Sequence, residues 1–347
     1  MKQIQKREIN LAWLSVFLFL LLVVSIFIVC GIGASDVTFR TAFEIIRGKL
    51  FGIGGESLNQ SDVYIVWNLR MPRAIGAIAI GGGLAVAGTA MQAVTRNVMA
   101  DPYVLGISSG ALAFVSVGAY FGGMAISIGW QTSLLAFAGS VFAVFMVFAI
   151  GGMKGNASGG RLILTGQAIS ITLNAVAQYF IYTSTAGNKS SSIVTWMMGS
   201  LAGIRWDNVW LTVAGILICT GFFIGYARAF DLIALGEETA ISLGINVARL
   251  KKLTLIVVSF ITGFAVASSG IIGLVGFMIP HIIRFLSGTS HKKLFPLTFL
   301  CGGVFLLWMD VLARTLLEPQ EVPIGIFTAL CGGPFFVWMI RKRMKGN

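Results

Sequence analysis

The chain has 347 residues, 56% of them hydrophobic and 11% charged, with a mean hydropathy of +0.89. Soluble domains are roughly 45–50% apolar and about 25% charged, so this composition excludes a water-soluble fold and makes lipid the main solvent. The formal net charge of +12 does not indicate a nucleic-acid-binding protein, because the basic residues form short clusters between apolar runs.

Apolar runs of about 20 residues, the length that crosses a bilayer as a helix, recur along the whole chain. Ten of them are predicted, at residues 11–32, 65–95, 104–122, 131–152, 161–183, 207–227, 252–269, 271–287, 295–317 and 324–340. Residues 31–62 carry mixed charge and scattered glycine, which predicts a loop. The short, Ser-rich stretch 190–203 predicts a helix lying at the membrane surface. We therefore expect an all-α, polytopic integral membrane protein that forms a single domain over residues 1–347.

Ten spans place both termini on one side of the membrane. Of the 25 basic residues, 17 then fall on the side of the termini and 8 on the other side. The positive-inside rule makes the richer side cytoplasmic. The basic residues Lys2, Lys6 and Arg7 could also begin a signal peptide. The apolar run after them is longer than a signal peptide needs and no A-x-A site follows, which favours a retained anchor.

No motif for chemistry is found in the sequence. No G-x-x-x-x-G-K-[ST] phosphate loop occurs, and the nearest stretch, Gly187-Asn188-Lys189-Ser190, lacks the glycine before the lysine. Neither a Ser/His/Asp set nor paired carboxylates lie within a span, so we predict no catalytic residues. The four cysteines show no metal-ligand spacing and the chain has only 2 histidines, so no metal site is predicted.

The second span begins with LRMPR at residues 69–73. The positions Ala79, Gly83 and Ala87 recur every four residues after it, which predicts a stripe for close helix packing. Arg70 and Arg73 lie at the outer mouth of this span. Composition alone leaves two interpretations of them open, a functional one and interfacial snorkelling.

The fifth span carries polar side chains on one face. They occur at spacings of three and four residues, which places them along one side of a helix: Gln167, Ser170, Asn174 and Gln178. Polar groups at bilayer depth need water or each other. The face predicts a hydrated translocation path, and hydrogen bonding between helices is the alternative.

Two further segments, one on the inner side and one on the outer side, are candidate functional elements. Residues 232–246 predict two short helical pieces, separated and ended by Gly236 and Gly244, which either dock on a cytoplasmic partner or lie on the membrane as an amphipathic helix. Near the outer end of the ninth span, Asp310 and Arg314 stand four residues apart and can form an ion pair.

Together these stretches resemble the FecCD-type permeases, the membrane subunits of type II ABC importers for iron-siderophores, haem and cobalamin. The resemblance rests on LRMPR at 69–73, RNVMADPYVLGISSGA at 96–111, ALGEETAISLGI at 234–245, GLVGFMIPHIIR at 273–284, and DVLAR with EVPIGIFTALCGGPFF within 310–336. One departure is Val98-Met99, where the family usually has Pro-Leu.

The resemblance implies a ten-helix permease that dimerises, with an identical or a paralogous subunit, around a path lined by the fifth span. It implies that Arg70, Arg73 and Arg314 face acidic residues of an extracytoplasmic substrate-binding protein. It also implies that the inner element seats on an ATPase subunit, which binds ATP and magnesium, while this chain binds no cofactor. The residues of that coupling element are Leu235, Gly236, Glu237, Glu238, Ala240, Leu243 and Gly244. The expected location is a prokaryotic plasma membrane.

The implied cargo is an iron-siderophore or a related metal chelate, with haem or cobalamin as alternatives. A different class, a secondary transporter without an ATPase, also stays open. Ion-coupled carriers place ionisable residues near the midplane. Here Asp310 is the one carboxylate well inside a predicted span, and Arg314 is near it.

Overall fold

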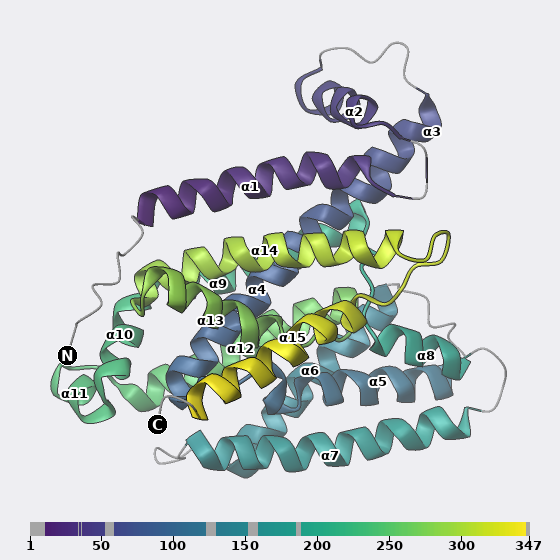
Figure 1. The fold of residues 1–347 in the computed structure, drawn as a ribbon. Coiled ribbons are helices and arrows are strands. Elements are labelled where there is room, and N and C mark those ends of the chain that lie inside the picture. Colours follow the sequence, from purple (N-terminus) through teal and green to yellow (C-terminus); the bar gives the residue numbers. More distant parts are fainter. Residues whose placement is uncertain are drawn as a thin grey trace.

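The computed structural model describes residues 11–33, 35, 37–52, 59–122, 130–151, 159–184 and 189–344. The elements in these ranges are helical (Figure 1). They are α1 (Leu11–Gly31), α2 (Phe39–Phe51), α3 (Gln60–Val63), the π-helical segment η1 (Tyr64–Arg70), α4 (Met71–Thr95), the 3-10 turn η2 (Pro102–Leu105), α5 (Ile107–Gly122), α6 (Trp130–Gly151), α7 (Gly159–Thr183), α8 (Lys189–Met197), α9 (Trp206–Gly225), α10 (Ala227–Leu235), α11 (Glu237–Ser242), α12 (Val247–Ser269), α13 (Val275–Ser287), α14 (His291–Thr315) and α15 (Ile324–Met344).

The all-α, polytopic prediction is confirmed. Within the described ranges, seven helical stretches are long and apolar enough to cross a membrane, and α5 and α13 are shorter apolar helices. Together with the 25-residue α7, they correspond to the ten predicted spans. The first turn of α1 and the last turn of α15 lie at the same end of the bundle as α10 and α11, which we call the α11 end, and α2 lies at the opposite, α2 end (Figure 1).

Helix α4 is the centre of the bundle. In the most apolar 18-residue part of the helical stretch Gln60–Thr95, 89% of the residues are buried. Helices α14, α12, α9 and α13 pack around α4. The close approach of α14 and α13 depends on two glycines of α4. Gly81 faces Gly302 of α14 and Gly88 faces Gly276 of α13, each so closely that a Cβ atom on one glycine would overlap the backbone of the other.

The prediction of a loop over residues 31–62 was wrong for the part that the structure describes. Helix α2 lies there, with Thr38 accepting a hydrogen bond from the Thr41 N–H at its start and Gly52 in the left-handed region at its end. Its buried face, formed by Ala42, Ile45 and Ile46, packs against α1 and η1. The mixed charge of this stretch concealed the helical spacing of these three apolar residues.

Helix α8 also differs from its prediction. It ends at Met197, and Ile193 and Trp196 are buried, so part of it packs into the bundle instead of lying on a surface.

Helix α13 is too short to cross a bilayer. Its 13 residues span about 20 Å, whereas the hydrocarbon core is about 30 Å thick. The non-helical residues 270–274 lead from the end of α12 to the start of α13. The backbone of Gly270 lies against Trp196. Irregular backbone at membrane depth is tolerated where protein buries it or where it lines a water-filled cavity. Residues 270–274 therefore mark a candidate cavity.

The contact between α4 and α13 predicts the effect of adding a side chain. The variant Gly88→Val should lose folded protein, because overpacking destabilises by about 1–3 kcal/mol and the added side chain meets backbone that cannot move aside. The matched control is Gly221→Val in α9, where nothing lies within 4 Å of the added Cβ. Thermal unfolding in detergent should separate the two variants, and equal midpoints would contradict this account of the core.

Candidate functional site

Three charged side chains from distant parts of the chain meet at the α2 end. Arg73 of α4 contacts Asp310 of α14 with 2.8 Å between Nη2 and Oδ1, and Glu321 with 2.7 Å between Nη1 and Oε1. Arg73 and Asp310 are buried, and Glu321 is partly exposed. Since an unpaired buried charge is strongly unfavourable, this cluster fastens α4, α14 and the segment before α15 to one another.

Arg70 and Arg314 hold the end of α1. Nη1 of Arg70 donates to the Cys30 carbonyl at 2.9 Å, and Nη2 of Arg314 donates to the Val29 carbonyl at 2.7 Å. The last carbonyls of a helix lack intrahelical partners and carry partial negative charge. The two arginines therefore satisfy groups that lipid could not. Arg70 also donates to the Ser35 hydroxyl, at 2.6 Å.

The same arginines line a pocket of about 410 Å³ at the α2 end. Arg70, Arg73, Arg205 and Arg314 reach it, and Glu321 is the one carboxylate among its lining residues. The pocket is therefore net positive, which suits a carboxylate from outside. The predicted docking residues thus lie together. Their guanidinium groups also bind groups of the chain itself, and their docking role stays a prediction.

The predicted pair of Asp310 and Arg314 is present, with 3.8 Å between Oδ2 and Nε. It is longer than the contact of Asp310 with Arg73, which sequence reasoning missed because 237 residues separate the two. A carboxylate inside an apolar span requires a cation, but the sequence offers several and does not indicate which one is near.

Helix α7 lies on the side of the isolated subunit farthest from α1 (Figure 1), and its polar face is partly accessible. Gln167 and Gln178 are exposed, and Ser170 and Asn174 are half-buried. The Ser170 hydroxyl donates to the Gly166 carbonyl of its own helix. Within the described ranges, none of the four side chains hydrogen-bonds to another helix, which disfavours packing within the subunit as their purpose.

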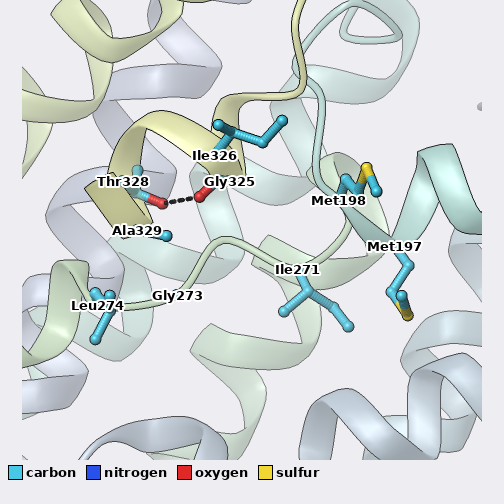
Figure 2. A pocket seen from close by; sticks show the side chains of 9 residues that line it. All are labelled: Met197, Met198, Ile271, Gly273, Leu274, Gly325, Ile326, Thr328 and Ala329. Carbon is cyan, nitrogen blue, oxygen red and sulfur yellow. Dashed lines mark hydrogen bonds between the residues drawn. The ribbon is translucent and has the colours of Figure 1, made fainter. Parts of the chain in front are cut away.

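A second pocket, of about 310 Å³, lies where residues 270–274 pass α8 and the start of α15 (Figure 2). Met197 and Met198 border it on one side, and Leu274 and the Gly273 backbone on another (Figure 2). Thr328 supplies a hydroxyl, which donates to the Gly325 carbonyl at 3.1 Å. No charged residue lines this pocket. Flexible, polarisable methionines adapt to bulky ligands.

Sequence reasoning missed this second pocket. The one signal was glycine on either side of two apolar residues, Gly270 to Gly273, in a run otherwise apolar enough for a span.

The loop from Arg96 to Gly106 fixes the geometry around this second pocket. Tyr103 accepts a hydrogen bond from the Ile272 N–H at 3.4 Å, and Gly106 lies against Ser170 of α7. Asp101 accepts from the Tyr103 N–H at 2.9 Å, at the start of the 3-10 turn η2. Burial raises the pKa of Asp101 to about 6. The loop thus connects the polar face of α7 to residues 270–274.

At the α11 end, α10 and α11 form two short helices, as predicted. Gly236 separates them with a φ of +135° and Gly244 follows α11 with a φ of +84°, conformations that side-chain-bearing residues rarely adopt. Exposed apolar side chains cover this element, and Glu237 is held by Lys251 of α12 at 2.6 Å. These exposed residues are Leu235, Ile241 and Leu243.

Asp231 fastens α10 to the bundle. Its Oδ1 accepts a hydrogen bond from the His291 N–H at 2.6 Å, and its Oδ2 accepts from the Ser290 hydroxyl at 3.2 Å. The contact joins α10 to the first residue of α14, whose other end carries Asp310. Sequence reasoning missed this contact, because Asp231 lies just before residues 232–246 and its partner lies 60 residues later. In the part of the chain that the structure describes, no group of three or more His, Cys, Asp or Glu side chains could hold a metal ion.

The chain is similar to known permeases along most of its length. Residues 21–342 match the FecCD transport family. The cobalamin import system permease protein BtuC of Halobacterium salinarum is 39% identical over 279 residues, which is 80% of this chain and 74% of that protein. The uncharacterized ABC transporter permease protein YvrB of Bacillus subtilis is 36% identical, covering 90% and 88%. A solved metal-chelate type ABC transporter in an inward-facing conformation superposes with a TM-score of 0.82 at 29% identity, covering 95% of this chain and 99% of that one.

The ion cluster predicts that removing a buried charge destabilises the fold far more than removing an exposed one. Asp310→Asn leaves Arg73 without its buried partner and should destabilise the fold by about 3–5 kcal/mol. Glu44→Gln, which breaks the exposed pair with Arg40, should change stability by about 1 kcal/mol or less. Thermal unfolding of both purified variants measures this, and an Asp310→Asn variant as stable as Glu44→Gln would contradict the structural role of the cluster.

Proposed function

Because the chain belongs to the FecCD transport family, we propose that it forms one half of a metal-chelate path in an ATP-driven importer. The chain is a multi-pass permease of the ABC importer class. The observation that best supports the path is the polar face of α7. Its residues Gln167, Ser170, Asn174 and Gln178 have no partner on another described helix, and Gln167 and Gln178 are exposed. A second permease subunit facing it would enclose these side chains in a hydrated route.

The pocket beside residues 270–274 supplies a second wall of this route. The loop that contains Tyr103 and Gly106 connects it to α7. Polar amides on one wall and methionines on the other suit a bulky chelate that carries its own ligands. The route has no fixed charge among the residues named here, so a cargo passes without being held at one ionic site.

The energy source belongs to a partner. The sequence contains no phosphate loop, so ATP and magnesium bind on a separate ATPase subunit and this chain is not an enzyme. The exposed apolar residues Leu235, Ile241 and Leu243, with Glu238 between them, form the surface that this ATPase contacts. Asp231 and Lys251 connect that surface to α14 and α12.

The α2 end faces the extracytoplasmic side, and the termini lie in the cytoplasm. This orientation follows from the positive-inside rule and places the arginine pocket where a substrate-binding protein would arrive. The net-positive pocket with Arg70, Arg73 and Arg314 suits acidic side chains on that protein.

Within the class of metal chelates, cobalamin is the first candidate. The Halobacterium relative, 39% identical, is named for cobalamin import. Iron-siderophores and haem belong to the same class and are the next candidates. A secondary transporter is disfavoured, because the carboxylate inside α14, Asp310, is occupied by Arg73 and is not free to carry a coupling ion.

The coupling proposal predicts the effect of a strained turn. In vesicles that contain this chain, a P-loop ATPase and a binding protein, uptake should require ATP. Gly236→Val introduces strain of about 1–3 kcal/mol at the turn and should lower uptake per ATP hydrolysed. Gly225→Val, at the end of α9 where space is open, should leave that ratio unchanged. Uptake by the permease alone, driven by a proton gradient, would contradict the proposal.

The path proposal predicts a difference between two positions on α7. Gln178→Leu replaces a wetted side chain on the polar face and should slow cobalamin uptake several-fold without loss of folded protein. Val176, two residues earlier, lies on the opposite side of the helix, so Val176→Leu should have no effect. Initial uptake rates in the same vesicles measure both. Equal rates for the two variants would remove the polar face from the path.

A further inference from the structure

Helix α2 has an exposed apolar row in addition to its buried face. Phe39, Phe43 and Leu50 follow one another at spacings of four and seven residues, so they lie on one side of the helix. They are 57%, 50% and 55% exposed, although Ala42 and Ile45 of the same helix are fully buried. An exposed row of large apolar side chains on a 13-residue helix requires an apolar environment.

This row continues the apolar surface of α1. The Phe43 ring lies 5.7 Å from the ring of Phe27, and Phe39 lies against Gly31, the last residue of α1. Toward the middle of α1, Phe19 and Leu20 are both 56% exposed, as expected of side chains that face acyl chains. The row on α2 therefore extends the lipid-facing surface just beyond the point where α1 ends, which is the level of the phospholipid headgroups.

Basic side chains flank the row. Arg47 and Lys49 are exposed, and among the described residues neither has a hydrogen bond or an ion pair. Arg40 is 89% exposed and contacts Glu44 at 3.0 Å. An apolar row beside arginine and lysine is the pattern of a helix that lies in the membrane interface, with the row toward the acyl chains and the cations among the phosphates. Arginine also binds phosphate through two parallel hydrogen bonds.

We propose that α2 is a binding site for anionic phospholipid, in which Phe39, Phe43 and Leu50 enter the acyl region and Arg47 and Lys49 bind the headgroup phosphate. The occupant is the leaflet at the α2 end, which is the outer leaflet in the orientation proposed above. The continuity with α1 favours lipid over a protein partner, because a protein that covered the row would also meet the acyl chains around α1.

Native mass spectrometry of the purified full-length chain tests the site, with phosphatidylglycerol and phosphatidylcholine as probes. The wild type should prefer phosphatidylglycerol. Arg47→Gln with Lys49→Gln should weaken that binding by about five-fold for each charge removed, without altering phosphatidylcholine binding. Arg47→Lys should keep most of the preference, and Glu44→Gln should increase it, because it removes a negative charge and releases Arg40. These side chains are on the surface, so the variants should fold.

Two outcomes would overturn the proposal. One is an unchanged preference for phosphatidylglycerol in the Arg47→Gln, Lys49→Gln variant. The other comes from a benzoylphenylalanine photocrosslinker placed at Phe43 in membranes that contain the whole transporter. Adducts with phospholipid support the site, whereas adducts with a protein would make this row a protein-docking surface.

Discussion

The close contact of α4 with α14 and α13 is the constraint on which the rest of the bundle depends. Glycines face each other at both contacts, so backbone meets backbone at Gly81 with Gly302 and at Gly88 with Gly276. Between lipid-solvated helices there is little hydrophobic gain in association, and close packing supplies the stability instead. Because Gly276 belongs to the short α13, the same contact fixes residues 270–274, and with them the second pocket, inside the bundle.

The charges at the α2 end follow from this packing. Arg73 emerges from the buried face of α4 beside Asp310, and a pair of opposite charges is the form in which ionisable groups are tolerated there. Arg70 and Arg314 cap the carbonyls of α1. The arginines therefore stabilise the subunit itself, whether or not a partner protein is bound. A substrate-binding protein would meet a pocket already organised by internal contacts, with Glu321 at its edge as the partly exposed acid.

Much of this architecture could be predicted from the sequence. The positions of the ten apolar segments, the small-residue stripe on α4 and the turns at Gly236 and Gly244 each depend on local patterns, such as apolar length or a glycine that permits positive φ. That the eighth segment forms a helix too short to cross a bilayer could not be predicted from its apolar length. Contacts between distant residues could not be predicted. The partner of Asp310 is 237 residues away, and Asp231 reaches a helix 60 residues later. Helix α2 was missed for a different reason, since its apolar residues are interspersed with charged ones, which conceals their helical spacing.

The central claim is that the polar face of α7 borders water while the opposite face of the same helix borders lipid. Cysteine accessibility tests it most directly, in a permease whose four native cysteines are replaced by alanine and which is assembled with its partners in vesicles. Cysteine at Gln178 should react with a membrane-impermeant thiol reagent, and cysteine at Val176 should not. Equal reaction at both positions, or reaction at Val176 alone, would contradict the claim that this face lines the translocation path.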